Sequence, residues 1–478
     1  MAVLSDPLSV ATGGTVVCAA LTALARRVAP SLGFVDAPDG GRKRHDQTTP
    51  LLGGAAVVLT VIVGAAVLSF GPLADWTALG PLLLSLTGIC GLGLWDDRFG
   101  MRPRTKLLGI ALASVPYAMV APAVAEVAVF HWVVPLGWLS LPFALFWLVC
   151  CANIVNLIDG LDGLATGVGL AAAATLALLA GHRGDPGSLW IAALLTGSLT
   201  GFLIHNWPPA RIFLGDAGSL SIGFLVGALA LETAQKRTAG FALVVPMVLL
   251  AIPVFDTAMA IVRRKLGGGS ISEADHRHLH HRLQARGLTR EQSLVTILLL
   301  CAAGCGAAVA SERLDSDWPA VLMCVAVFSS LIWARVFGDE ETNLLVLHLR
   351  AIGDAVGQST RAMRLRILMV QLEARATQPR PAQRADREPT LSELAQQLRP
   401  LGVQSLAVRD EAGSDFRLSE PPVDAGASAS VWQLRVAPGT DGVELELSGD
   451  THDARLDEIL LAVRYWSKKT GSTDRTAA

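Results

Sequence analysis

The stretch Asn153-Ile-Val-Asn-Leu-Ile-Asp-Gly-Leu-Asp-Gly163 decides how this chain is organised. Before it lies an apolar run, Pro135 to Cys151, that is just long enough to cross a bilayer, and a second apolar run begins at Leu164. Two carboxylates and two amides lie between these runs. A charged side chain at the centre of a bilayer costs about 2.5–3.5 kcal/mol, so we expect this stretch at an edge of the membrane.

The side chains of this stretch suit a hard metal ion. Carboxylate and amide oxygens are ligands that Mg²⁺ prefers, whereas zinc and copper favour nitrogen and sulfur. The glycines after Asp159 and Asp162 permit a tight backbone turn that would bring both carboxylates near one site. The alternative is a turn between two helices whose acids are solvated.

The composition is typical of a membrane protein. Hydrophobic residues make up 52% of the chain and charged residues only 17%, compared with about 25% charged in soluble domains. Long apolar runs recur as far as about residue 337, so residues 1–338 are predicted to form an all-α, polytopic membrane domain. Eleven spans are expected, at about residues 9–28, 51–70, 79–94, 106–124, 135–151, 166–181, 187–204, 217–233, 240–262, 291–310 and 318–337.

Basic residues are distributed unevenly between the loops that separate these spans. The loops after odd-numbered spans, with their edges, contain Arg26, Arg27, Arg42, Lys43, Arg44, Arg98, Arg102, Arg104, Lys106, Arg211, Arg263, Arg264, Lys265, Arg277, Arg282, Arg286 and Arg290. The other loops contain only Arg183, Lys236, Arg237 and Arg313. Positive charge favours the cytoplasmic side, which predicts an outside N-terminus and a cytoplasmic C-terminal third. The run Ala11 to Ala29 lacks a preceding basic region and is predicted as a first membrane helix rather than a cleavable signal peptide.

This topology places every notable polar cluster on the cytoplasmic side. The clusters are Arg42–His45, Asp96-Asp97 with Lys106, Asn153–Asp162, Phe213–Ser219 and Asp275–Arg282. Solvated loops would have no reason to agree in this way, whereas a single active site requires it. The sequence therefore predicts one active site at the cytoplasmic face.

Asp96 and Asp97 directly follow the third span. Adjacent carboxylates repel each other, and a nearby cation relieves that repulsion. Lys106 begins the next span and would reach back toward them, while Arg98, Arg102 and Arg104 would neutralise the acids or bind phosphate. The alternative is a helix C-terminus that meets water.

Asp216 lies in Phe213-Leu-Gly-Asp-Ala-Gly-Ser219, just before the eighth span. Flanking glycines permit close approach of the backbone, and the helix N-terminus that follows offers amides to a phosphate. A plain N-cap is the alternative reading of this aspartate.

Four of the chain's ten histidines lie in Asp275-His-Arg-His-Leu-His-His-Arg282. Protonated histidines and arginines together would clamp a diphosphate. A zinc site and a solvated basic loop are the alternatives, although no cysteine lies nearby. The cysteines are predicted as small packing residues: Cys18, Cys90, Cys150, Cys151, Cys301, Cys305 and Cys324.

These motifs together resemble a known family. Asp96-Asp97, Asn153–Gly163, Phe213–Ser219 and His278-Leu-His-His281 occur in the order seen in the polyprenyl-phosphate N-acetylhexosamine-1-phosphate transferases, over about residues 10–337. That family includes bacterial undecaprenyl-phosphate GlcNAc-1-phosphate transferases and phospho-MurNAc-pentapeptide translocase. Residues Gly33–Pro38, Arg42-Lys43, His45 and Gly53-Gly54 are similar to the family's first cytoplasmic loop. The His-x-His-His-Arg-Leu form, followed by Arg286-Gly-Leu288, resembles the GlcNAc branch, because pentapeptide translocases carry three consecutive histidines there.

The resemblance implies a reaction and a set of site residues. N-acetylhexosamine-1-phosphate, GlcNAc-1-phosphate in this branch, would pass from a UDP-sugar to undecaprenyl phosphate with release of UMP, as the first membrane step of cell-envelope polysaccharide synthesis. It implies Mg²⁺, with Mn²⁺ as an alternative, bound by Asn156 and Asp216. The implied catalytic residues are Asp96, Asp97, His278, His280 and His281. The implied substrate-binding residues are Lys43, His45, Lys106, Asn153, Asp159, Asp162 and Arg282.

Chemistry constrains the role of the aspartate pair. The second pKa of a phosphate monoester is about 6, so the acceptor is already largely dianionic at neutral pH. A carboxylate at its reference pKa of about 3.9 is a weak base. We therefore expect Asp96 and Asp97 to position the acceptor or the metal more than to remove a proton.

Other functions predict different patterns. An ion-coupled transporter would carry acids at mid-depth in its spans, whereas these acids gather at one face. A CDP-alcohol phosphotransferase would carry Asp-Gly-x-x-Ala-Arg, but Asp162-Gly-Leu-Ala-Thr-Gly167 lacks the arginine. A translocase-like enzyme acting on the pentapeptide sugar is the nearer alternative.

The charged C-terminal part is predicted to carry no catalytic residues. Residues 339–389 are expected to form an amphipathic helix and a linker rich in Pro and Arg. Residues 390–478 are expected to form a small cytoplasmic α/β domain, with helices at 391–398 and 455–466 and strands at 403–408, 431–436 and 443–447. The expected partners are a UDP-N-acetylhexosamine, undecaprenyl phosphate and the bilayer of a bacterial inner membrane, with no nucleic acid and with a homodimer left open.

Overall fold

The computed structural model describes residues 6–36, 49–73, 76–121, 126–129, 132–234, 241–242, 248–266, 278–333 and four short segments between 403 and 450. The chain divides into two units. The first comprises Met1–Ile261 with Ser272–Gly338, and the second comprises Val262–Ile271 with Asp339–Ala478.

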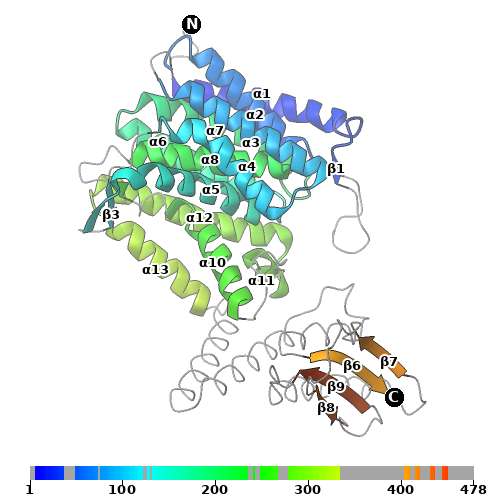
Figure 1. The fold of residues 1–478 in the computed structure, drawn as a ribbon. Coiled ribbons are helices and arrows are strands. Elements are labelled where there is room, and N and C mark those ends of the chain that lie inside the picture. Colours follow the sequence, from blue (N-terminus) through cyan, green and yellow to red (C-terminus); the bar gives the residue numbers. More distant parts are fainter. Residues whose placement is uncertain are drawn as a thin grey trace. The chain divides into compact units, whose positions relative to one another are not determined.

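The first unit is a bundle of helices (Figure 1). The described helices are α1 (Pro7–Val28), α2 (Gly53–Leu68), α3 (Leu79–Phe99), α4 (Pro103–Ala118), α5 (Ser140–Ile158), α6 (Leu164–His182), α7 (Pro186–Asn206), α8 (Gly215–Ala234), α10 (Ala251–Leu266), α11 (Leu279–Ala285), α12 (Arg290–Arg313) and α13 (Trp318–Trp333). Short strands lie between them: β1 (Val35–Asp36) pairs antiparallel with β2 (Thr49–Pro50), and β3 (Glu126–Val129) pairs antiparallel with β4 (Trp132–Pro135) and parallel with β5 (Phe241–Ala242).

Seven of the described helices are long and apolar enough to cross a membrane. They are α1, α3, α5 with the 3₁₀ turn before it (Gly137–Leu139), α6, α7, α8 and α12. Three further apolar helices are shorter, namely α2, residues Ala251–Ile261 of α10, and α13. The prediction of a mainly helical polytopic fold is confirmed, whereas the predicted number of eleven spans stays a prediction.

Helix α8 lies at the centre of the bundle and packs against α2, α3, α5 and α6 (Figure 1). Every residue from Ala217 to Thr233 is buried. Small residues allow this, because neighbouring backbones approach α8 closely. A Cβ atom placed on Gly223 would lie 2.4 Å from the carbonyl oxygen of Cys151 in α5. Helix α8 is therefore the scaffold on which the surrounding helices are placed.

Helix α4 is anchored to α8 by a buried polar contact. The hydroxyl of Tyr117 lies 3.0 Å from Glu232 Oε1 and 3.1 Å from the carbonyl oxygen of Ala228. A buried hydroxyl and a buried carboxyl each need a partner, so this pairing fixes the register of the two helices. The register matters because Lys106 lies one turn into α4.

Two helices extend farther than the sequence predicts. The third span was expected to end at residue 94, but α3 continues to Phe99 and carries both aspartates in its last turn. The fifth was expected to end at residue 151, but α5 continues to Ile158 and includes Asn153 and Asn156. The turn is confined to the five residues that follow. Polar side chains at the end of a helix can face a polar site, so the length of an apolar run underestimates the length of the helix.

The second unit contains a four-stranded antiparallel sheet in the order β7-β6-β9-β8. The strands are β6 (Val403–Arg409), β7 (Asp415–Ser419), β8 (Val431–Val436) and β9 (Glu444–Asp450). Three of them match predicted strands, and β7 was not predicted. The amphipathic helix and linker expected at 339–389, and the helices expected at 391–398 and 455–466, lie outside the described residues.

Candidate active site

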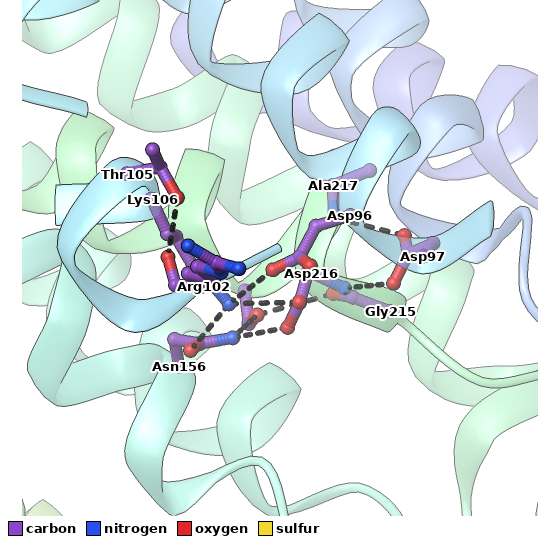
Figure 2. Close-up of polar contacts among 10 residues, drawn as sticks. Asp96, Asp97, Arg102, Thr105, Lys106, Asn156, Gly215, Asp216 and Ala217 are labelled. Carbon is purple, nitrogen blue, oxygen red and sulfur yellow. Dashed lines mark hydrogen bonds and ion pairs between the residues drawn. The ribbon is translucent and has the colours of Figure 1, made fainter. Parts of the chain in front are cut away.

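Three side-chain oxygens from three helices converge on the ammonium group of Lys106 (Figure 2). Lys106 Nζ lies 2.7 Å from Asp216 Oδ2, 2.9 Å from Asp96 Oδ2 and 3.2 Å from Asn156 Oδ1. These groups come from the C-terminal end of α3, the first turn of α4, the end of α5 and the start of α8. Two carboxylates at such close range would repel each other, and the ammonium offsets that repulsion.

Asn156 links this cluster to the body of α8. Its amide nitrogen donates to Asp216 Oδ1 over 2.5 Å and to Ser219 Oγ over 2.9 Å. Ser219 Oγ in turn donates to the carbonyl oxygen of Gly215 over 3.1 Å. The amide group is thereby held in one orientation, with its oxygen directed at Lys106.

The carboxylate of Asp97 has different hydrogen-bond partners from that of its neighbour Asp96. Its Oδ1 accepts from the backbone N–H of Asp216 over 2.7 Å, and its Oδ2 accepts from the N–H of Ala217 over 3.1 Å. The first turn of a helix has N–H groups without intrahelical partners, and a carboxylate there also complements the helix dipole. Asp97 therefore caps α8 from α3, and its charge fixes where Asp216 sits.

The backbones around this cap approach too closely for larger residues. Gly215 has a φ of +70°, and a Cβ on it would lie 2.6 Å from Asp97 Oδ2. A Cβ on Gly93 of α3 would lie 2.4 Å from Cα of Ala217. Glycine at both positions lets α3 deliver its carboxylate directly onto the first turn of α8.

A second group of polar residues forms the turn between α5 and α6. Asp162 Oδ2 accepts from the backbone N–H of Ala210 over 3.0 Å. The side chain of Asn206 accepts from Gly163 N–H over 3.1 Å and from Thr166 Oγ1 over 2.8 Å, and it donates to the carbonyl oxygen of Ile212 over 3.0 Å. The turn is thus tied to the segment between α7 and α8.

Asp159 occupies the first position of this turn. Burial, together with the negative charges of Asp216, Asp97 and Asp162, raises the pKa of Asp159 to about 8. A cation bound nearby would have the opposite effect, because it would favour the ionised carboxylate.

A third group contains the histidines at the start of α11. His278 Nδ1 lies 2.9 Å from Asp256 Oδ2, and the N–H of Leu279 donates to Asp256 Oδ1 over 2.9 Å. His280 is buried, and its ring lies against the turn after α5, because a Cβ on Gly160 would be 3.2 Å from His280 Cε1. The ring of His281 is tilted by 44° to that of His280, with the ring centroids 4.1 Å apart. The histidine loop and the turn after α5 therefore form one contact region.

The structure brings together some of the predicted site residues and separates others. Asp96, Asp97, Lys106, Asn156 and Asp216 form one cluster, and His280 lies beside the turn that holds Asp159 and Asp162. Asn153 instead donates to the carbonyl oxygen of Val149 within its own helix, over 2.8 Å. Arg282 lies in α11, and Lys43 and His45 lie outside the described residues. The assigned roles of all these residues stay predictions.

Three residues at the site escaped the sequence analysis: Ser219, Asn206 and Asp256. Ser219 lies within a motif that was recognised for its aspartate. Asn206 and Asp256 each stand in largely apolar sequence, and an isolated polar side chain in a span is a signal that could have identified both. Their partners are remote in sequence, so only the folded chain reveals what they bind.

The donor atoms of the Lys106 cluster suit a hard cation. Two carboxylates and an amide oxygen are ligands that Mg²⁺ accepts. The ammonium now lies where these oxygens converge, so it marks a position with a strong preference for positive charge. Within the described residues there is no group of three His, Cys, Asp or Glu side chains placed to hold a metal ion.

Comparison with known proteins agrees with this arrangement. Residues 79–234 match the family described as glycosyl transferase family 4. A probable undecaprenyl-phosphate N-acetylglucosaminyl 1-phosphate transferase of Bacillus subtilis is 35% identical over 59% of this chain and 78% of its own length. A decaprenyl-phosphate N-acetylglucosaminephosphotransferase of Mycolicibacterium smegmatis is 33% identical over 61% of this chain and 79% of its own. An undecaprenyl-phosphate alpha-N-acetylglucosaminyl 1-phosphate transferase of Salmonella typhi is 30% identical over 64% and 84%.

The family match begins at α3 and ends at the last residue of α8. It therefore contains the five residues of the Lys106 cluster and the turn that follows α5. Several described helices are apolar and long enough to span a bilayer, and the alignments with this chain include 78–84% of the length of each of the three relatives. The chain is therefore a multi-pass membrane protein that belongs to the glycosyl transferase family 4, the polyprenyl-phosphate N-acetylhexosamine-1-phosphate transferases.

Proposed function

We propose that this protein transfers N-acetylglucosamine-1-phosphate from UDP-GlcNAc to undecaprenyl phosphate, releasing UMP. The observation that carries the proposal is the convergence of Asp96, Asn156 and Asp216 on Lys106 at the ends of apolar helices. A fixed cluster of opposite charges beside apolar helices suits a reaction between a charged, soluble donor and a phosphate on a lipid. The names of the three relatives support the same acceptor class and sugar.

The reaction is a displacement at phosphorus. An oxygen of the acceptor phosphate forms a bond to the β-phosphorus of the UDP-sugar, and the bond from that phosphorus to the bridging oxygen breaks. The bridging oxygen leaves on UMP, and the product is a lipid diphosphate that carries the sugar. Such a transfer depends on alignment of the two oxygens and on neutralisation of charge.

Lys106 would neutralise charge on the reacting phosphates. Its ammonium lies in a site where no water layer separates it from the carboxylates, so it acts at lower effective dielectric than in water. Asp96 and Asp97 would position rather than deprotonate. Both oxygens of Asp97 already accept backbone N–H groups of α8, which supports that role.

Mg²⁺ would be held by Asn156 and Asp216, whose oxygens have the right chemistry for it. When bound, it would supply positive charge to the donor diphosphate. Lys106 would then contact phosphate instead of the oxygens that it contacts now, since two cations would repel each other at one position. Asp159 and Asp162 would support the nucleotide side of the site.

The site would face the cytoplasm of a bacterial inner membrane. The excess of basic residues in the loops after the odd-numbered predicted spans supports this orientation, and UDP-sugars are made in the cytoplasm. The histidines of α11 and Arg282 would lie on the same side and bind the donor phosphates.

The test is an assay of the purified protein in detergent with Mg²⁺, undecaprenyl phosphate and one UDP-sugar at a time. UMP release with UDP-GlcNAc is expected, together with a lipid product that carries the sugar. UDP-GalNAc and the UDP-MurNAc-pentapeptide are the comparison donors. Release with the pentapeptide donor alone would favour a translocase-like activity, and no release with any of the three would refute the proposal.

A further inference from the structure

Asp256 is a buried carboxylate to which the proposed reaction gives no task. It lies in α10, and only 6% of its side chain is exposed. It lies outside residues 79–234, which match the family. Its two oxygens have different partners, the ring of His278 and the backbone N–H of Leu279.

The two contacts join α10 to the start of α11. Helix α11 has no side-chain cap of its own, because His278 occupies the N-cap position without capping the helix. Asp256 Oδ1 supplies the missing acceptor at 2.9 Å from Leu279 N. This contact holds the backbone next to His278 in place independently of the imidazole ring.

The second contact determines the state of the imidazole ring. A carboxylate oxygen only accepts, so the hydrogen bond of 2.9 Å to Asp256 Oδ2 requires a proton on Nδ1 of His278. Nε2 is then the only ring nitrogen that remains for a ligand. An imidazole whose second nitrogen is fixed in this way has a defined tautomer and ring orientation.

The surroundings of the ring place it beside the proposed site. The rings of His278 and His280 are nearly parallel, with an interplanar angle of 3° and centroids 6.2 Å apart. His280 contacts the turn after α5 at Gly160, next to Asp159. The His278 side chain is 13% exposed, twice as open as its carboxylate partner.

We propose that Asp256 is a positioning residue, which holds His278 with its proton on Nδ1 so that Nε2 is presented to the phosphates of the donor sugar nucleotide. This inference rests on the proposed function. Asp256 itself contacts no substrate in this account. Its carboxylate acts on the reaction only through the ring that it orients.

The substitution Asp256→Asn separates the two contacts. An asparagine oxygen can still accept from Leu279 N–H, so the start of α11 is kept. The amide nitrogen now faces Nδ1 and donates to it, which forces the proton of a neutral ring onto Nε2. The expected result is a fall in kcat of about 10- to 100-fold, the range seen when a carboxylate that orients a metal-binding histidine is removed.

The decisive measurement is a double-mutant cycle with His278→Ala, using UMP release by the full-length protein. If Asp256 acts through His278, the double variant has the same kcat and KM as His278→Ala alone. Independent losses that multiply would overturn the inference, and so would an Asp256→Asn variant with wild-type kcat. A purely structural role also predicts a lower Tm for Asp256→Asn, whereas the positioning role predicts an unchanged Tm.

Two further variants complete the test. His278→Asn keeps a side-chain N–H for Asp256 but has no atom at the position of Nε2, so a folded protein with a kcat as low as that of His278→Ala is expected even if Asp256→Asn does not fold. A His278→Asn variant with full activity would refute the inference. Asp185→Asn is the matched control, because Asp185 is a buried carboxylate beside the first turn of α7, where Ser188 Oγ donates to it over 2.6 Å. Its kcat and KM are expected to stay at wild-type values.

The failure of this inference is distinct from failure of the proposed function. If the wild-type protein releases no UMP, the proposed function fails. If the wild type is active and the cycle is additive, only the positioning role of Asp256 fails.

Discussion

The neighbouring aspartates Asp96 and Asp97 have different partners at this site. Asp96 pairs with Lys106, while Asp97, the next residue, accepts from two backbone N–H groups of α8. On a helix, consecutive side chains point about 100° apart, so the two carboxylates reach different groups. Asp96 therefore forms an ion pair and Asp97 caps a helix, so the two acids are not equivalent.

Asp97→Asn tests the capping role. An asparagine places an N–H donor against one of the two backbone N–H groups, so the free energy of unfolding is expected to fall by about 1.5–3 kcal/mol. The start of α8 shifts, and kcat falls on the order of 100-fold, because small displacements of reacting groups have large effects. Thermal unfolding and UMP release measure the two effects.

Raising the pH should not restore the activity of Asp97→Asn. Recovery at high pH, with unchanged lipid and metal affinity, would mean that Asp97 removes a proton. Asp6→Asn is the control, since Asp6 caps the first turn of α1 at an exposed position through Ser9 N. Asparagine is as good an N-cap as aspartate there, so stability is expected to be unchanged.

Lys106→Met tests whether the ammonium and a divalent cation share the same oxygens. The substitution leaves Asp96 and Asp216 without their cation, so the protein is expected to be less stable in EDTA and inactive in transfer. Added Mg²⁺ should raise the Tm of the variant more than that of the wild type, because the metal no longer competes with an ammonium. An equal shift in both proteins would show that the metal binds elsewhere.

Asp159 gives the site a pH-dependent stability. Its pKa of about 8 in the folded protein exceeds the ordinary value of 3.8. Between these values the Asp159 carboxyl is protonated in the folded state and ionised in the unfolded state. The free energy of unfolding therefore falls as the pH rises from about 4 to 8. Asp159→Asn removes this effect. In EDTA, the Tm of the variant relative to wild type is therefore expected to rise from pH 5 to pH 8, and a constant difference would contradict the pKa shift.

At the scale of elements, the site depends on how closely α3 and α8 approach. The sequence of α3 offers a matched pair of glycines for a test. A Cβ on Gly93 would lie 2.4 Å from Cα of Ala217, whereas a Cβ on Gly91 of the same helix would meet nothing within 4 Å. Gly93 therefore faces α8, and Gly91 faces away from it.

Gly93→Ala is expected to push α3 away from the start of α8. Overpacking of this kind costs about 1–3 kcal/mol, and the displaced Asp97 carboxylate should lower kcat as well. Gly91→Ala should leave kcat unchanged and keep or slightly raise the Tm, because alanine favours a helix more than glycine does. UMP release and thermal unfolding of both variants decide the matter, and equal behaviour of the two would contradict the close packing.

At the scale of the whole molecule, the site belongs to the first unit alone. Every predicted site residue precedes Gly338, and the three relatives align with 59–64% of this chain. A chain that ends after Gly338 is therefore expected to retain UMP release at the wild-type kcat in detergent. Loss of activity in a truncated protein with an unchanged Tm would show that residues 339–478 contribute to the reaction.

The amino-acid sequence by itself determined the class of the fold and singled out the five residues that meet in the Lys106 cluster. Apolar runs long enough to span a bilayer stand out without any structure, because membrane insertion depends on local hydrophobicity. Motifs such as Asn153–Gly163 and Phe213–Ser219 stand out because aspartate or asparagine and glycine cluster there at the edges of apolar runs. The strands at 403–409, 431–436 and 444–450 were also recognisable, from local alternation.

Only the tertiary structure decided which group each of these side chains contacts. The different roles of Asp96 and Asp97 and the pairing of Asp256 with His278 depend on partners remote in sequence. Asn153, by contrast, bonds within its own helix and does not join the Lys106 cluster. A hydrogen bond is made over about 3 Å with a defined direction, and those two quantities follow from the packing of helices. Local sequence encodes which chemical groups are available, and the packed bundle determines which of them meet.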